Sequence, residues 1–187
     1  MPISSDHPLR RLFRDLVHRQ FLGEEHLPDR EAAEYVSGVL TDFTHVDHVY
    51  RIRDARGQRL EDVADMLIES NPLLHARSFD REREVRRHIG DYTLFFTGLF
   101  PESVAALPRR RPLSADVFVD YVRAGKESYA VVAAFDVGTH ARQARLFRRL
   151  SDQFERCVFA LNGVKRELER LERGCYRQLQ ASLGLDD

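Results

Sequence analysis

The sequence predicts an all-α protein, a single-domain bundle of five or six helices with a long C-terminal helix. Apolar residues recur at intervals of three and four along most of the chain, whereas the alternation of a half-buried strand is nearly absent. Clusters of proline, glycine and short polar residues divide these periodic stretches into segments of helical length. A chain of 187 residues suits one domain with its own core, so residues 1–187 are interpreted as one unit.

Three helices are expected in the N-terminal part of the chain. The first covers about residues 8–22. The second begins after Asp29, whose carboxylate can cap it, and continues until Gly57. A short third helix covers about residues 60–69 and ends before an Asn-Pro pair. The inward positions of the second helix are expected to be Ala32, Val36, Val39, Phe43, Val46 and Tyr50.

The C-terminal part of the chain is expected to form the longer helices. The fourth helix, about residues 80–100, is the most apolar and is ended by a proline. After a proline-rich connection, Ser114 can cap a fifth helix, about residues 114–137. The last helix covers about residues 140–183, because its apolar spacing of three and four residues passes the Asn162-Gly163 pair without a shift. Its apolar positions are Phe147, Leu150, Phe154, Cys157, Leu161, Val164, Leu168, Leu171 and Cys175.

The length of the last helix predicts self-association. A helix of about 44 residues is roughly 66 Å long, whereas the second and fifth helices would reach only about 35 Å. Residues 165–183 would therefore overhang the bundle as a coiled-coil-like extension, and an exposed apolar seam needs a partner. The alternative is that the seam folds against the first helix of the same chain. The interface of a homo-oligomer is expected at Val164, Leu168, Leu171, Cys175 and Leu179.

Composition narrows the class of protein. The formal net charge of −1 disfavours nucleic acid as a partner, and no apolar run is long enough to span a membrane. The N-terminus lacks a signal-peptide core. Cys157 and Cys175 would lie roughly 27 Å apart on one helix, too far to form a disulfide. A cytoplasmic protein is expected, and the preference for arginine over lysine fits a GC-rich bacterial coding sequence.

A polar group lies inside the most apolar helix. His88, Asp91 and Tyr92 are three and four residues apart and therefore share one level of that helix. A buried carboxylate must be paired or protonated, so Asp91 is expected to pair with His88 or with an arginine of another helix. The other interpretation is a small-molecule pocket, to which Tyr121 and Gly125 would contribute. An open cavity favours the pocket, and a sealed hydrogen-bonded cluster favours a structural role.

Three glycines inside helices predict close helix crossings. A glycine in a helix interior costs about 1 kcal/mol relative to alanine, and it usually allows another backbone or a ligand to come near. Gly90 and Gly98 share one face of the fourth helix, and Gly125 lies on the apolar face of the fifth.

Metal and enzyme chemistry receive little support from the sequence. Asp42, His45 and His48 have a metal-like spacing, but the helical phase directs His48 outward and His45 to the flank. The chain has no nucleophile elbow, P-loop or dinucleotide fingerprint. No catalytic residue, metal ligand or cofactor is therefore assigned. The sequence favours a non-enzymatic interaction or scaffold protein, with a ligand- or metal-binding bundle as the alternative.

Overall fold

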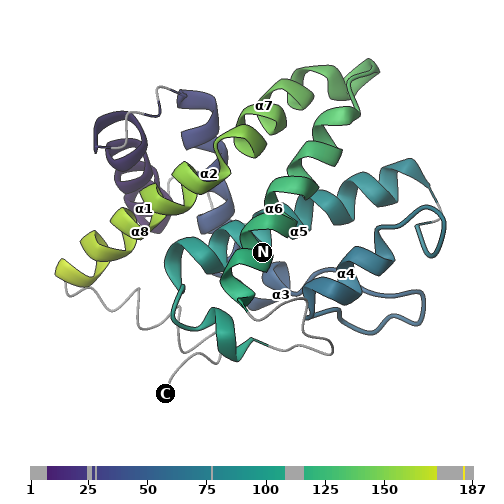
Figure 1. Cartoon of the computed structure of the whole chain (residues 1–187). Coiled ribbons are helices and arrows are strands. Elements are labelled where there is room, and N and C mark those ends of the chain that lie inside the picture. The colour runs from purple at the N-terminus through teal and green to yellow at the C-terminus, as the bar shows by residue number, and fades with distance from the viewer. Residues whose placement is uncertain are drawn as a thin grey trace.

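The computed structural model describes residues 8–24, 27, 29–76, 78–107, 116–171 and 183, and within these ranges it is helical without a β-strand (Figure 1). The all-α prediction is confirmed. A π-helical turn, Gln20–Glu24, continues the first helix, and short 3-10 turns lie at Val104–Ala106 and Gly138–His140. The α-helices are α1 (Pro8–Arg19), α2 (Arg30–Asp42), α3 (Val46–Val49), α4 (Val63–Glu69), α5 (Phe79–Leu99), α6 (Val117–Ala134), α7 (Ala141–Asp152) and α8 (Phe154–Arg170).

Side-chain caps explain where several helices begin. The expected cap at Asp29 is confirmed, because its Oδ1 accepts a hydrogen bond of 3.0 Å from the Ala32 amide. Asp62 and Ser78 cap α4 and α5 in the same way. The cap of α6 is Asp116, and Ser114 lies outside the described residues. Each cap accepts a bond from a backbone amide that has no partner within its own helix.

The second expected helix is broken into two, which corrects the prediction. α2 ends at Asp42, and α3 begins at Val46 after a turn. The turn changes the helical phase, so Val46 is 36% exposed although it was expected to face inward, and Val49 is buried instead. The turn, residues 43–45, contains neither proline nor glycine, which is why the sequence pattern did not reveal it.

The last expected helix is also interrupted, at Gln153. The Gln153 backbone (φ −112°, ψ 22°) leaves the helical region, so α7 and α8 are separate helices. The bend places Phe154 against Gly125 of α6, and Ser151 Oγ donates to the Lys126 carbonyl at 2.9 Å. Only one residue leaves the helix, so the apolar spacing is unchanged. The helix is continuous through Asn162, as expected, whereas residues 172–182 lie outside the described ranges.

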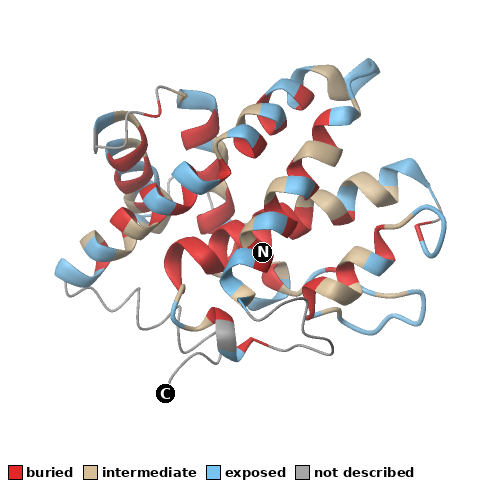
Figure 2. Cartoon of the chain, viewed as in Figure 1, coloured by how far each residue is buried: buried red, intermediate tan, exposed pale blue. Residues whose placement is uncertain are grey.

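α5 forms the centre of the bundle. It packs mainly on α6 and α8, and every residue from 88 to 100 is buried (Figure 2). The expected close crossings are confirmed. A Cβ on Gly90 would lie 2.3 Å from the Tyr129 ring, and one on Gly98 would lie 2.6 Å from Leu161. A Cβ on Gly125 would lie 2.2 Å from Thr93 Oγ1, so glycine is required at each of these positions.

Candidate functional site

A cavity of about 440 Å³ lies between α2, α5 and the segment that contains α3. It is close to the middle of the bundle, where Asp91 of the central helix forms part of its lining. Its lining combines acidic, basic and apolar side chains. From α2 and the turn after it come Glu34, Tyr35, Gly38, Val39, Asp42 and Phe43; from α3 and the residues that follow, His48 and Arg51; and from α5, Arg87 and Asp91.

The Asp91 carboxylate joins three helices at the base of this cavity. Its Oδ1 atom accepts a hydrogen bond of 2.6 Å from the Tyr35 hydroxyl of α2 and one of 2.8 Å from the Tyr129 hydroxyl of α6. Asp91 is 4% exposed, so these bonds lie in a water-poor environment where hydrogen bonds are strong. Its Oδ2 atom accepts no hydrogen bond from any residue in the described ranges.

Arg87 lies one helical turn before Asp91 and provides the positive charge of the site. Its Nε donates to the Tyr35 hydroxyl at 2.9 Å and lies 3.8 Å from Asp91 Oδ2. The guanidinium carbon stands 5.3 Å from the centre of the Tyr35 ring and 5.9 Å from that of Phe147, which fixes its plane by cation–π contact. The expectation that Asp91 is buried and paired is confirmed. Its charged partner is an arginine of its own helix rather than His88.

Burial and mutual contact shift the pKa values of this group in different directions. Burial raises the pKa of Asp91, and the charge of Arg87 opposes that effect. The pKa values of Tyr35 and Tyr129 are well above their ordinary range, first because of burial and then because of the Asp91 charge. Both tyrosines therefore keep their protons and act as donors. Burial lowers the pKa of Arg87, but Tyr35 and Asp91 outweigh it, so Arg87 remains charged.

The outer part of the cavity carries two charged side chains that have no partner among the described residues. Arg51 is exposed and makes no hydrogen bond or ion pair within the part of the chain that the structure describes. It is nevertheless close enough to lower the pKa of Asp91. Asp42, on the α2 side, is likewise exposed, and its side chain is unpaired among the described residues. Glu34 is different, because Arg14 holds it at 2.9 Å and His18 at 3.2 Å.

Gly38 lines the cavity without being required by packing. It lies in the interior of α2, and a Cβ built on it would meet no atom within 4 Å. The glycines at 90, 98 and 125 are explained by close contacts, but Gly38 is not. Alanine would fit and would stabilise the helix by about 1 kcal/mol. What glycine provides at this position is open space in the cavity wall.

The other residues expected at a pocket are enclosed in the core. His88 is fully buried beside the rings of Phe43 and Tyr92, at 5.8 and 6.1 Å between centroids. Neither of its ring nitrogens has a hydrogen-bond partner among the described residues. Burial, with smaller effects of Arg51 and Arg87, lowers its pKa to about 3, so it is neutral at pH 7.

Tyr92, Tyr121 and Gly125 likewise do not line the cavity. The Tyr92 hydroxyl donates to the Glu61 carbonyl at 3.2 Å, and its ring lies 6.3 Å from that of Tyr121. Gly125 is packed between Thr93 and Phe154. Of the five residues assigned to a ligand site from the sequence, the structure brings only Asp91 to the cavity lining.

The fold buries part of the expected oligomer interface and leaves another part exposed. Val164 and Leu168 are 0% and 1% exposed, because α8 packs on α5, α1 and the π-helical turn of the same chain. Leu171 is 43% exposed. Cys175 and Leu179 lie outside the described residues. At Val164 and Leu168, the alternative that the seam folds against the first helix of the same chain is the arrangement observed.

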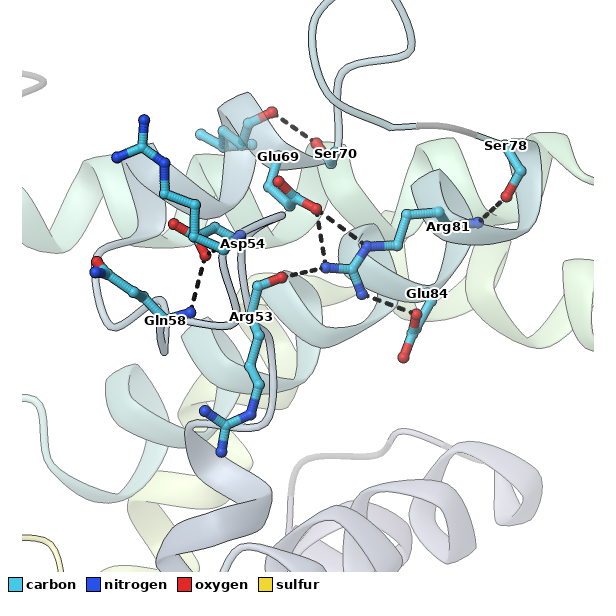
Figure 3. Close-up of polar contacts among 10 residues, drawn as sticks. Arg53, Asp54, Gln58, Glu69, Ser70, Ser78, Arg81 and Glu84 are labelled. Carbon is cyan, nitrogen blue, oxygen red and sulfur yellow. Dashed lines mark hydrogen bonds and ion pairs between the residues drawn. The ribbon is translucent and has the colours of Figure 1, made fainter.

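A second hollow, of about 260 Å³, lies beside the 53–60 loop, and two of its acidic side chains, Asp54 and Glu69, are already hydrogen-bonded. Arg81 of α5 donates to Glu69 Oε1 at 2.9 Å and to the Arg53 carbonyl at 2.6 Å (Figure 3). Asp54 Oδ1 accepts two backbone amides of its own loop, at 2.8 and 2.9 Å. These bonds hold the loop against α4 and α5, so this hollow is explained as structural support.

Several residues of the site were not predicted from the sequence, among them Glu34, Arg51, Arg87, Gly38 and Tyr35. Arg87 had a local signal, because it precedes Asp91 by four residues and such pairs face each other on a helix. Gly38 also had one, as a glycine in a helix interior without a turn. Tyr35 had none, because it meets Asp91 across 56 positions of the sequence.

Comparisons with protein-family models, with curated proteins and with solved structures found no match to this chain. No helix within the described ranges is long and apolar enough to cross a membrane. Among the described residues, no group of three His, Cys, Asp or Glu side chains is placed to hold a metal ion.

Proposed function

We propose that this chain is a ligand-binding helical bundle and that the cavity at Asp91 is its binding site. The observation that carries the proposal is a carboxylate that is 4% exposed, held by two tyrosines at one oxygen, whose other oxygen accepts no hydrogen bond in the described chain. A cavity of about 440 Å³ with a few convergent polar groups has the size of a small-molecule site.

Gly38 supports the same proposal. A helix-interior glycine that no neighbour requires costs stability, and at this position it keeps the cavity open. Stability given up at one place is typical of positions that serve function.

The test uses Gly38→Leu, whose Cβ meets no atom within 4 Å and whose side chain would occupy cavity space, and Gly23→Leu as the matched control. Gly23 also has no atom within 4 Å of a built Cβ, but it does not line the cavity. A mixed library of small polar metabolites is screened by thermal shift. A ligand present at 100 times its Kd stabilises by about 2.7 kcal/mol, which raises Tm by about 5–10 °C.

We expect at least one compound to raise the Tm of the wild type and of Gly23→Leu but not of Gly38→Leu. If no compound stabilises the wild type, or if Gly38→Leu responds equally, the proposal is wrong.

Self-association through the C-terminal segment is a second proposal. The exposure of Leu171 at the end of α8 supports it, because a large apolar side chain in solvent can join an interface. The proposal of a scaffold protein depends on this contact. It is tested by the oligomeric state of a Leu171 variant, described below.

A further inference from the structure

We infer that the cavity at Asp91 accepts a compact zwitterion, a molecule with one carboxylate and one ammonium group, of which a free α-amino acid is the simplest class. This inference rests on the proposed ligand-binding function and names the chemistry that the site would recognise. It follows from the charges of the cavity lining and from the hydrogen-bonding atoms that they leave free.

The charges of the lining balance once Glu34 is set aside. Glu34 is held by Arg14 and His18 at its outer side. Besides His48, two acidic and two basic side chains then remain, with Arg87 3.8 Å from Asp91 Oδ2. A ligand with one charge of each sign can pair with both the acidic and the basic side chains. A simple anion or cation would instead lie beside two side chains of its own charge and carry no opposite charge to pair with them. The remaining charged residues are Asp42, Arg51, Arg87 and Asp91.

The two arginines suit a carboxylate. Arg87 uses Nε on Tyr35, and its terminal nitrogens donate no hydrogen bond to any described residue. Its plane is fixed by the Tyr35 and Phe147 rings, which prepares the paired N–H groups for a carboxylate. Arg51 lies at the same cavity and has no partner in the described ranges.

The acidic side chains suit an ammonium group. Asp91 Oδ1 is saturated by two tyrosine hydroxyls, which leaves Oδ2 as the acceptor that a ligand can reach. An ammonium group has three donors and can bridge Oδ2 to Asp42 on the facing helix. Val39 and Phe43, both buried, supply an apolar wall beside these groups, against which a hydrocarbon side chain can pack.

The experiment measures the binding of twenty standard L-amino acids by thermal shift and then by calorimetry. The best of them is compared with two analogues of the same shape, its deaminated carboxylic acid and its primary amide. We expect the amino acid to bind about tenfold or more tightly than either analogue, because each analogue lacks one charge-assisted hydrogen-bonding group.

Arg51→Gln provides the residue-level test. We expect it to weaken binding of the amino acid by about tenfold while leaving binding of the amide unchanged, since the amide has no carboxylate for Arg51. Arg30→Gln is the control, because Arg30 is an exposed arginine of α2 outside the cavity.

The outcomes separate this inference from the proposed function. If no amino acid binds but another compound is blocked by Gly38→Leu, the zwitterion inference is wrong and the binding site stands. Equal binding of an amino acid and one of its single-charge analogues also overturns the inference. If no compound of any class binds, both are wrong.

Discussion

Replacing Asp91 by alanine removes the acceptor on which three helices meet. The substitution strands the Arg87 charge and leaves the Tyr35 and Tyr129 hydroxyls without their shared acceptor. Breaking a buried charged pair from one side typically costs about 3–5 kcal/mol. The Arg87 side chain is 37% exposed, so solvent screens part of its charge, and the lower end of that range applies. We expect a loss of about 3 kcal/mol, equivalent to about 6–12 °C in Tm.

Urea denaturation of Asp91→Ala, Asp91→Asn and His48→Ala measures this effect. Asp91→Asn keeps an acceptor for both tyrosines and loses only the charge, so its stability should lie between those of the wild type and Asp91→Ala. His48 lines the same cavity, but its side chain makes no hydrogen bond with a described residue, so His48→Ala should change stability by less than about 0.5 kcal/mol.

Equal or greater stability of Asp91→Ala would refute the structural reasoning. The carboxylate would then be a net cost to the fold despite its two short hydrogen bonds. In that case the whole effect of the residue would have to be assigned to ligand binding, since a buried charge kept at a cost is typical of a functional position.

Three further results are expected. Gly38→Ala should raise the free energy of unfolding by about 0.5–1 kcal/mol. Gly90→Ala should lower it by about 1–3 kcal/mol, because its Cβ would lie 2.3 Å from the Tyr129 ring. Equal effects of the two substitutions in urea denaturation would contradict the assigned contacts. His88 has a pKa of about 3 in the folded chain, against an ordinary 6.5. Between these two pH values its imidazole ring binds a proton in the unfolded chain but not in the folded chain. Relative to His88→Leu, the wild type should therefore lose about 1.4 kcal/mol per pH unit as pH falls from about 6 to 4, and parallel stability curves would exclude this. Leu171→Glu should shift the protein toward monomer in light scattering without unfolding it, and a wild type that is monomeric at micromolar concentration would rule out the interface.

The helical segments were predictable because their signals are local. Asp29 and the apolar repeat lie within a few residues of the structure that they specify. The interruptions at residues 43–45 and at Gln153 were not predictable in this way. Gln153 bends the chain so that Phe154 can fill the space beside Gly125 of α6, and that space exists only in the packed bundle. A one-residue interruption also leaves the apolar spacing intact.

The candidate site could be predicted only in part for a related reason. The sequence indicated Asp91 as a polar residue in an apolar helix, and this alone located the site. The orientation of its carboxylate depends on hydrogen bonds from Tyr35 and Tyr129, which are 56 and 38 positions away in the sequence. His88 and Tyr92 have the correct spacing, but they lie on sides of α5 that the bundle encloses.

The sharing of one Asp91 oxygen by Tyr35 and Tyr129 gives α6 a means of sensing a cavity that it does not line. A cationic group bound at Oδ2 would draw negative charge toward itself and weaken both tyrosine bonds at Oδ1, although Tyr129 does not line the cavity. The Tyr129 ring also packs on Phe147 of α7, at 5.4 Å between centroids. We therefore expect binding of the proposed ligand to affect α6 and α7 through α5, and changes in amide hydrogen exchange along those two helices would report it at a distance from the cavity.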